Sequence, residues 1–186
     1  SARIVLVGCG NMGYAMLAGW LSSGKLRADE AIVVEPTDAL RERAAALGVT
    51  ALPEAGAIPA DAAPRLVVFA VKPQVILDVV PAYARFKPST TYVSVAAGTP
   101  ISAFESALGA DAGVIRCMPN TPAAIGKGMM VVVANGNVGD ATNDFVRDLL
   151  SASGEVATID DEGLMDAVTA VSGSGPAYVF HFIECL

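Results

Sequence analysis

The sequence carries little charge: 17% of its 186 residues are Asp, Glu, Lys or Arg, whereas 53% are hydrophobic. Disordered chains have the opposite composition, so the sequence predicts a folded chain with a buried core. The 19 acidic residues outnumber the 12 basic ones, which gives a net charge of −7. A nucleic-acid-binding surface needs clustered Lys and Arg, and this balance argues against one.

Long hydrophobic runs are also lacking. No stretch reaches the roughly 18 uncharged apolar residues that a membrane-spanning helix requires, so we expect no membrane segment. Residues 3–7, an arginine followed by four apolar residues, are typical of a strand and run directly into glycines. We therefore expect no signal peptide.

Cysteine and histidine are scarce. The three cysteines, Cys9, Cys117 and Cys185, lie far apart, and His181 is the single histidine. This spacing is not that of metal ligands, so no metal site is predicted. Unpaired cysteines favour a reducing, cytoplasmic location. His181 lies in an apolar stretch, where a lone histidine is more often a packed residue than a ligand.

Short apolar runs rich in β-branched residues alternate with amphipathic segments over most of the chain. The runs predict strands at residues 3–7, 31–35, 66–71, 92–96, 114–118, 129–134 and 155–159. The amphipathic segments predict helices at residues 11–23, 39–47, 74–84, 101–108 and 140–152. Near-continuous apolar strands are typical of a sheet that is covered on both faces. The alternation predicts an α/β fold with a doubly wound, mostly parallel sheet.

The pattern changes near Asp160. Two helices are predicted at residues 162–171 and 176–186, on either side of the sequence Ser172-Gly173-Ser174-Gly175. The second helix is apolar nearly all the way round, and such a helix has to be buried between partners. We therefore expect residues 161–186 to be the first helices of an all-α domain that is incomplete in this sequence.

A G-x-G-x-x-G sequence lies between the first predicted strand and the first predicted helix. In dinucleotide-binding folds the first glycine permits a tight turn, the second lets the backbone approach a pyrophosphate, and the third lets the helix pack closely on the strand. The alternative is a simple turn that happens to use three glycines. The context favours a Rossmann-type dinucleotide-binding domain over residues 1–160, with the pyrophosphate at Gly8, Gly10, Asn11, Met12 and Gly13.

Glu35 ends the second predicted strand, about 20 residues after the last glycine of the loop, where a ribose-binding acid is expected. A carboxylate at this position accepts hydrogen bonds from the ribose 2′-OH and repels a 2′-phosphate, which favours NADH over NADPH. Arg41 and Arg43 follow on the next predicted helix and could reach a phosphate if Glu35 turned away.

Further motifs follow later predicted strands. They are Ala70-Val71-Lys72-Pro73-Gln74, Ala96-Ala97-Gly98, Arg116-Cys117-Met118-Pro119-Asn120-Thr121-Pro122 and Ser172-Gly173-Ser174-Gly175-Pro176-Ala177-Tyr178. Together with the glycine loop, this set resembles the pyrroline-5-carboxylate reductase family over the whole chain. The resemblance implies a Rossmann domain followed by a helical dimerisation domain. It also implies that NAD(P)H reduces the cyclic imine 1-pyrroline-5-carboxylate to L-proline, at a site between the two domains near the subunit interface of a homo-oligomer.

The resemblance also implies roles for individual residues. Those that would border the cofactor's ribose and nicotinamide are Val71, Lys72, Pro73, Ala97 and Gly98, and the pocket candidates are Asn120, Glu162 and Ser174. Three features depart from the family: many relatives carry Ser, Thr or Arg where this chain has Glu35, some have an Asn where it has Ala55, and the family's later Gly-Gly-Thr-Thr-like motif is not among these residues. The first two argue against the use of NADPH, and the third predicts that part of the substrate site is missing from this sequence.

No His, Cys or Asp constellation typical of catalysis is present. A cyclic imine is protonated appreciably near neutral pH, so the task of the protein is mainly to hold it against the nicotinamide and to exclude water. Lys72 could donate a proton, but a position beside the cofactor ribose is favoured. Two alternatives stay open. One is a related hydroxyacid or ketopantoate-type dehydrogenase, which would need a catalytic Lys that residues 162–186 lack. The other is a non-catalytic nucleotide-binding module.

Overall fold

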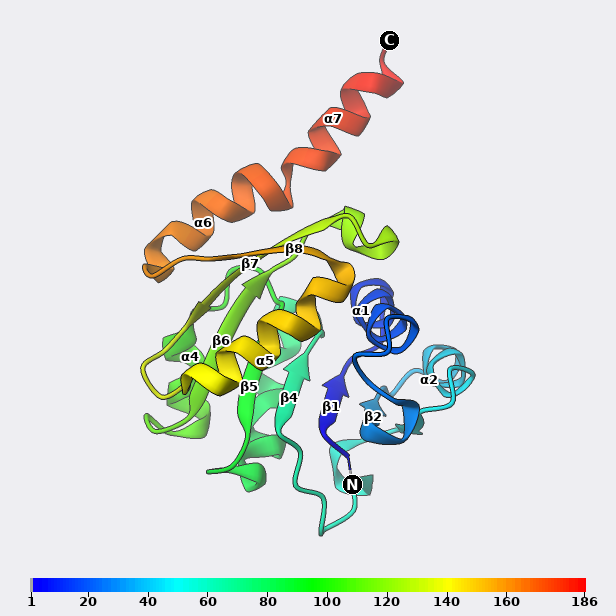
Figure 1. Cartoon of the computed structure of the whole chain (residues 1–186), viewed down its shortest axis with the longest axis vertical. Coiled ribbons are helices and arrows are strands. Elements are labelled where there is room, and N and C mark those ends of the chain that lie inside the picture. Colours follow the sequence, from blue (N-terminus) through cyan, green and yellow to red (C-terminus); the bar gives the residue numbers. More distant parts are fainter. Residues whose placement is uncertain (1) are drawn as a thin grey trace.

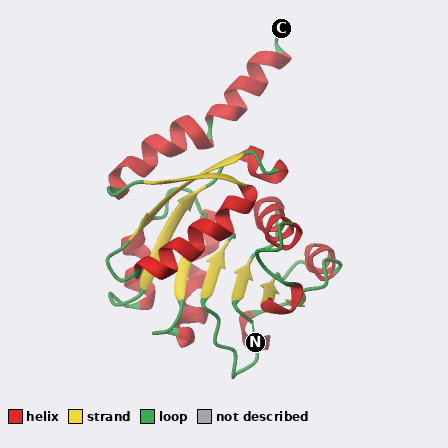
Figure 2. Ribbon diagram, in the orientation of Figure 1, coloured by secondary structure: helices red, strands yellow, loops and turns green. Residues whose placement is uncertain are grey.

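The computed structural model of the chain describes residues 2–186 and contains one eight-stranded sheet with helices on both faces (Figures 1 and 2). The sheet order is β3-β2-β1-β4-β5-β6-β7-β8, and every neighbouring pair is parallel except β6 and β7. The strands are β1 (Ile4–Val7), β2 (Ala31–Val34), β3 (Thr50–Leu52), β4 (Leu66–Phe69), β5 (Thr91–Ser94), β6 (Gly113–Met118), β7 (Gly128–Ala134) and β8 (Gly154–Thr158). The predicted doubly wound, mostly parallel sheet is confirmed.

The alternation of side chains along each strand builds two separate cores, one on each face of the sheet. Residues Ile4 and Leu6 of β1 face the core that α1 (Asn11–Ser22) and α5 (Asp140–Leu150) cover. Their neighbours Val5 and Val7 face the other core, which α3 (Ile76–Val79) and α4 (Ile101–Leu108) cover. Helix α2 (Asp38–Ala45) contributes Ala44 to the first core.

The strand order reverses at β1, which pairs with β2 on one side and β4 on the other. Val7 is level with Val34 of β2 and with Phe69 of β4, so the three strands end together. After β1 the chain enters α1 on one face of the sheet, whereas after β4 it continues to α3 on the other face. In open α/β sheets such a reversal leaves a crevice at the carboxyl ends of the strands, where ligands bind.

One strand of the sheet is missing from the prediction, and one predicted helix is broken. Strand β3 was not predicted because it is a three-residue edge strand of mixed exposure, with no periodicity to detect. The helix predicted at residues 74–84 is broken into the 3₁₀ turn Pro73–Val75, helix α3, and the 3₁₀ segment Val80–Phe86. Pro81 lacks the N–H that a continuous α-helix would need at that position.

The last helices leave the sheet. Helix α6 (Met165–Val168), a π-helical turn at Thr169–Gly173 and helix α7 (Gly175–Glu184) extend beyond β7 and β8, and the carboxyl terminus lies far from the sheet (Figure 1). Within the part of the chain that the structure describes, α7 has no buried residue, and Tyr178 and Phe182 are 72% and 65% exposed. No helix in residues 2–186 has the length and hydropathy needed to cross a membrane.

The aromatic core beneath α3 and α4 gives a first testable prediction. The buried hydroxyl of Tyr92 donates a hydrogen bond of 3.0 Å to the carbonyl oxygen of Tyr83. Tyr92→Phe is expected to lower the free energy of unfolding by about 1–2 kcal/mol, because it leaves a buried carbonyl without its donor. Chemical denaturation at pH 7 measures this difference.

The same variant tests a pH dependence. Burial raises the pKa of Tyr92 to about 12, so above pH 10 the unfolded chain loses this proton before the folded chain does. Stability therefore falls as pH rises from 10 to 12, and Tyr92→Phe should flatten part of that fall. The control is Tyr14→Phe, which keeps the ring that packs against Arg43 and removes a hydroxyl with no hydrogen bond to any described residue. Equal slopes in Tyr92→Phe and wild type would contradict the assignment.

Candidate functional site

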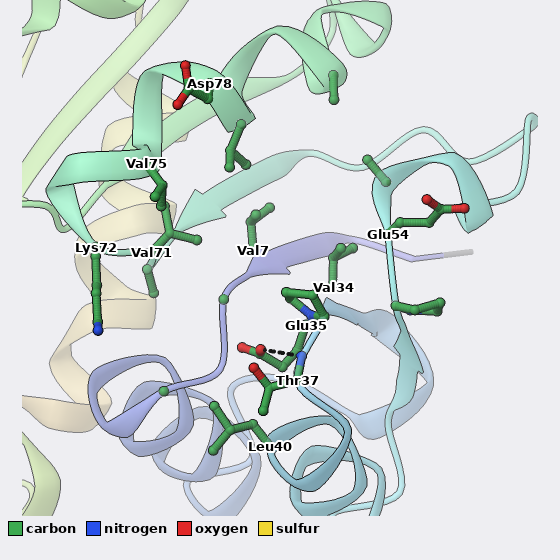
Figure 3. A pocket seen from close by; sticks show the side chains of 18 of the residues that line it. Val7, Val34, Glu35, Thr37, Leu40, Glu54, Val71, Lys72, Val75 and Asp78 are labelled. Carbon is green, nitrogen blue, oxygen red and sulfur yellow. Dashed lines mark hydrogen bonds between the residues drawn. The ribbon is translucent and has the colours of Figure 1, made fainter.

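A cavity of about 620 Å³ opens at the carboxyl ends of β1, β2 and β4, where the strand order reverses (Figure 3). Its walls combine residues from the segments that follow these three strands. Those that were predicted to bind the cofactor and line the cavity are Gly8, Gly10, Glu35, Val71 and Lys72. Its size suits a small ligand or half of a dinucleotide.

The three glycines of the G-x-G-x-x-G sequence differ in what the fold requires of them. Gly8 has a φ of +86°, and a Cβ on it would lie 2.8 Å from the carbonyl oxygen of Ala70. A Cβ on Gly13 would overlap the carbonyl oxygen of Gly8. A Cβ on Gly10 would meet no heavy atom of residues 2–186 within 4 Å, so the protein itself does not require glycine there. The free space beside Gly10 is what a ligand that approaches the backbone would use.

Helix α1 begins at Asn11, directly after the loop, and Met12 and Gly13 complete its first turn. In the described chain, Gly10 at the N-cap supplies no side-chain hydrogen bond to that turn. The first N–H groups of a helix favour anions. The loop therefore fits a pyrophosphate, as its sequence predicts.

Glu35 forms part of the cavity wall and is held in place. It is 5% exposed, and its two carboxylate oxygens accept hydrogen bonds from the backbone N–H groups of Cys9 at 2.8 Å and Thr37 at 2.9 Å. Figure 3 shows the second of these bonds at the edge of the cavity. Because a carboxylate oxygen has a further lone pair, Glu35 can still accept a hydrogen bond from a hydroxyl group in the cavity.

The two arginines of α2 are engaged elsewhere. The guanidinium of Arg41 donates to the carbonyl oxygen of Glu35 at 3.0 Å and forms an ion pair with Asp38. The guanidinium of Arg43 lies 4.1 Å from the centre of the Tyr14 ring and donates to the carbonyl oxygens of the glycine loop. These contacts hold both guanidinium groups in place.

The described residues that line the cavity carry more negative than positive charge. Three are acids, Glu35, Glu54 and Asp78, and Lys72 is the one cation among them. Lys72 is exposed and lies directly before the 3₁₀ turn that begins at Pro73. Because the cavity already carries net negative charge, it disfavours a ligand that places a further anionic group inside it.

The thiol in the loop is not a reactive one. Burial raises the pKa of Cys9 to about 11, and the carboxylate of Glu35 acts in the same direction, although the Arg43 guanidinium opposes them. Cys9 therefore stays protonated at neutral pH and packs as a small apolar residue.

The remaining predicted site residues lie outside this cavity. Ala97 and Gly98 are exposed in the connection between β5 and α4, one strand beyond β4. The amide of Asn120 accepts a hydrogen bond from the N–H of Met129 at 2.8 Å and lies 3.5 Å from the hydroxyl of Ser172. Ser174 is half-buried, two residues farther along.

Glu162 is tied into the fold. Its carboxylate oxygen Oε1 accepts from the N–H of Ile101 at 2.8 Å and from Nη1 of Arg116 at 3.0 Å. Arg116 was not among the predicted site residues. The sequence feature that could have identified it is a charged residue inside the apolar run of β6. In the structure Arg116 is 4% exposed, and a charge buried to this extent requires a partner. No group of three His, Cys, Asp or Glu side chains that could hold a metal ion is found among residues 2–186.

Two family models match parts of the chain. Residues 3–98 match the family model described as NADP oxidoreductase coenzyme F420-dependent, and residues 162–186 match the model of pyrroline-5-carboxylate reductase dimerisation. Pyrroline-5-carboxylate reductase of Pseudomonas aeruginosa is 39% identical over 99% of this chain and 67% of its own length. That of Escherichia coli is 35% identical over 99% and 68%.

Solved structures agree with these matches. A pyrroline-5-carboxylate reductase from Coxiella burnetii superposes with a TM-score of 0.90 at 27% identity, covering all of this chain and 68% of that one. A pyrroline carboxylate reductase from Plasmodium falciparum with NADP bound has a TM-score of 0.86 at 26% identity, also over all of this chain and 68% of that one. A prephenate dehydrogenase from A. aeolicus, at 15% identity and a TM-score of 0.76, shares the fold.

Proposed function

The chain belongs to the pyrroline-5-carboxylate reductase family, and from this premise we propose that it reduces 1-pyrroline-5-carboxylate to L-proline with NAD(P)H. The observation that carries the proposal is the glycine-lined cavity at the reversal of the strand order, in a chain that matches reductases of this family over nearly its whole length. An open space beside Gly10, next to an uncapped helix start, fits a dinucleotide.

The proposed reaction needs little acid or base catalysis by side chains of the protein. When bound, NAD(P)H would supply the hydride that reduces the imine carbon, and a cyclic imine is protonated appreciably near neutral pH. Ala97 and Gly98, exposed at the end of β5, offer small residues along which a planar ring can lie. We propose that Asn120 and Ser174 border the substrate from the side of β6 and α7. Their role is to orient the substrate and to exclude water rather than to transfer a proton.

We propose NADH as the preferred cofactor. Glu35 is anchored by two backbone N–H groups, so it cannot easily turn away from a 2′-phosphate. The two nearby cations, Arg41 and Arg43, are held in other contacts, and the cavity already contains three acids. A ribose 2′-OH can donate a hydrogen bond to Glu35, whereas a 2′-phosphate would be repelled.

The match to the dimerisation model indicates a homo-oligomer. We propose a homodimer or a higher homo-oligomer in which the apolar side chains of α7, such as Phe182 and Ile183, are covered. We further propose a domain boundary near Asp160, with residues 1–160 as the dinucleotide-binding domain and residues 161–186 as part of the helical domain. Free buried thiols at Cys9 and Cys117 support a reducing cytoplasm as the location.

The activity is tested by proline-dependent reduction of NAD⁺ at alkaline pH and by NADH oxidation with 1-pyrroline-5-carboxylate. Both assays are run on this 186-residue chain and on a longer chain with the remaining length found in its relatives, of which this sequence spans about two thirds. We expect the protein to reduce 1-pyrroline-5-carboxylate and not to reduce 2-ketopantoate. Binding of NADH without turnover in either chain would instead favour a nucleotide-binding module.

A further inference from the structure

An ion pair between a buried arginine and a half-buried glutamate joins the sheet to the helical segment, and neither residue lines the cofactor cavity. Arg116 lies on β6, paired with Ser94 of β5 and Val133 of β7, and its side chain is 5% exposed. Its Nη1 lies 3.0 Å from Oε1 of Glu162. A buried guanidinium is costly unless a carboxylate compensates it, so this pair fixes where the segment after β8 can lie.

The same carboxylate also completes helix α4. The N-cap position of α4 is Pro100, which has no side chain able to accept a hydrogen bond from the first turn. Glu162 accepts from the N–H of Ile101 instead, from 61 residues farther along the chain. A single oxygen atom therefore connects the start of α4, the middle of β6 and the start of the helical segment.

Contacts farther along β6 extend this junction toward the proposed site. A Cβ on Gly173 would lie 3.3 Å from Sδ of Met118, so the π-helical turn packs directly on β6. The side chains of Asn120 and Ser172 meet next to it. Met165 of α6 is fully buried in the core that also contains Ile101. The helical segment is thus held by one polar and one apolar anchor.

We propose that Arg116 and Glu162 are a positioning pair for hydride transfer. The pair fixes residues 97–100, which precede α4, relative to residues 172–175, which precede α7. These two stretches are where the proposed function, on which this inference rests, places the nicotinamide and the substrate. Neither residue lines the cavity at β1, β2 and β4, so the pair should affect the alignment of the reactants and not the affinity for the nucleotide.

The test separates alignment from general stability. Glu162→Gln keeps an oxygen that can accept from Ile101 but removes the negative charge that compensates Arg116. We expect kcat/KM for the imine to fall about tenfold or more, while the Kd for NADH stays within about twofold. Arg116→Met should give a similar loss, and Arg116→Lys, which keeps the charge, should recover part of it. The double variant Arg116→Met/Glu162→Gln should lose less than the product of the two single losses, because both break one link.

Asp160→Asn is the matched control. Asp160 is an exposed acid two residues before Glu162, and it forms no ion pair with any described residue. We expect its kcat/KM to stay within about twofold of wild type. A parallel fall in kcat/KM, NADH affinity and melting temperature in the Arg116 and Glu162 variants would overturn the proposal in favour of a purely structural role. Independent, multiplicative losses in the double variant would overturn it as well.

Hydrogen exchange keeps this test separate from the test of the enzyme activity. In Glu162→Gln we expect faster amide exchange in peptides that cover residues 97–101 and 169–175, and unchanged exchange in the glycine loop. This result can be obtained even if the wild type does not reduce the imine. Unchanged exchange in both stretches would overturn the positioning role without bearing on the proposed reaction.

Discussion

Gly10→Val is expected to weaken the binding of NADH strongly and to leave the fold intact. The protein has no atom near the position of the new side chain, and the backbone at Gly10 has a φ of −66°, which any residue adopts. The added methyl groups therefore occupy the space in which the pyrophosphate would approach the loop. We expect an affinity loss of about 100-fold, which corresponds to about 2.7 kcal/mol. Fluorescence titration with NADH and thermal unfolding of the same samples measure the two effects.

Gly13→Val is the contrasting variant. Its side chain would overlap the carbonyl oxygen of Gly8, so it should lower the stability by about 1–3 kcal/mol or more, together with binding. Gly136→Ala serves as the neutral control, since a Cβ there meets no described atom within 4 Å and the residue lies outside the cavity. Wild-type NADH affinity in Gly10→Val would show that the cofactor does not approach this loop.

Glu35→Gln is expected to shift the cofactor preference toward NADPH. The substitution keeps the shape of the side chain and removes the charge that would repel a 2′-phosphate, so the ratio of kcat/KM for NADPH to that for NADH should rise about tenfold or more. Glu35→Ser, which also removes the bulk, should shift the ratio in the same direction. Because Cys9 and Thr37 both donate to Glu35, we also expect a loss of about 1–3 kcal/mol in stability.

Glu42→Gln is the matched control for this shift. Glu42 is an exposed acid on the same helix as Arg41 and Arg43, and it does not line the cavity. Its variant should keep the wild-type ratio. If Glu35→Gln and Glu35→Ser also keep that ratio, the carboxylate does not determine the choice between the two cofactors.

The sequence predicts most of the fold because its strands are buried on both faces. Short apolar runs such as residues 66–71 are typical of strands in the centre of a parallel sheet. The glycines after β1 match the known geometry of a turn from a strand into a helix. The edge strand β3 could not be predicted in this way, because three residues carry no periodicity and its existence depends on pairing with β2. The break in the helix at residues 74–84 could have been predicted, since Pro81 lies inside it.

The candidate site could be predicted only in part, because some of its side chains depend on hydrogen-bond partners that are far away in the sequence. The position of Glu35 follows from its distance along the chain from the glycine loop. That its two oxygens are both engaged depends on Cys9 and Thr37, which no local pattern links to it. Likewise, Arg116 is conspicuous within β6, but its partner Glu162 is 46 residues away. A single sequence offers several acids for that role, and packing selects among them.

The bonds that Glu35 and Arg43 make to the glycine loop have a consequence for how fast and how tightly a nucleotide can be captured. Glycines lose more conformational freedom on becoming ordered than any other residue. If the loop were disordered before binding, this loss of entropy would lower the affinity for the nucleotide. Here Glu35 accepts a hydrogen bond from the N–H of Cys9, and Arg43 donates to the carbonyl oxygens of Cys9 and Gly10. The loop is preorganised, and its ordering belongs to the folding of the domain. Association should then proceed in a single kinetic phase, without a slow rearrangement after the encounter.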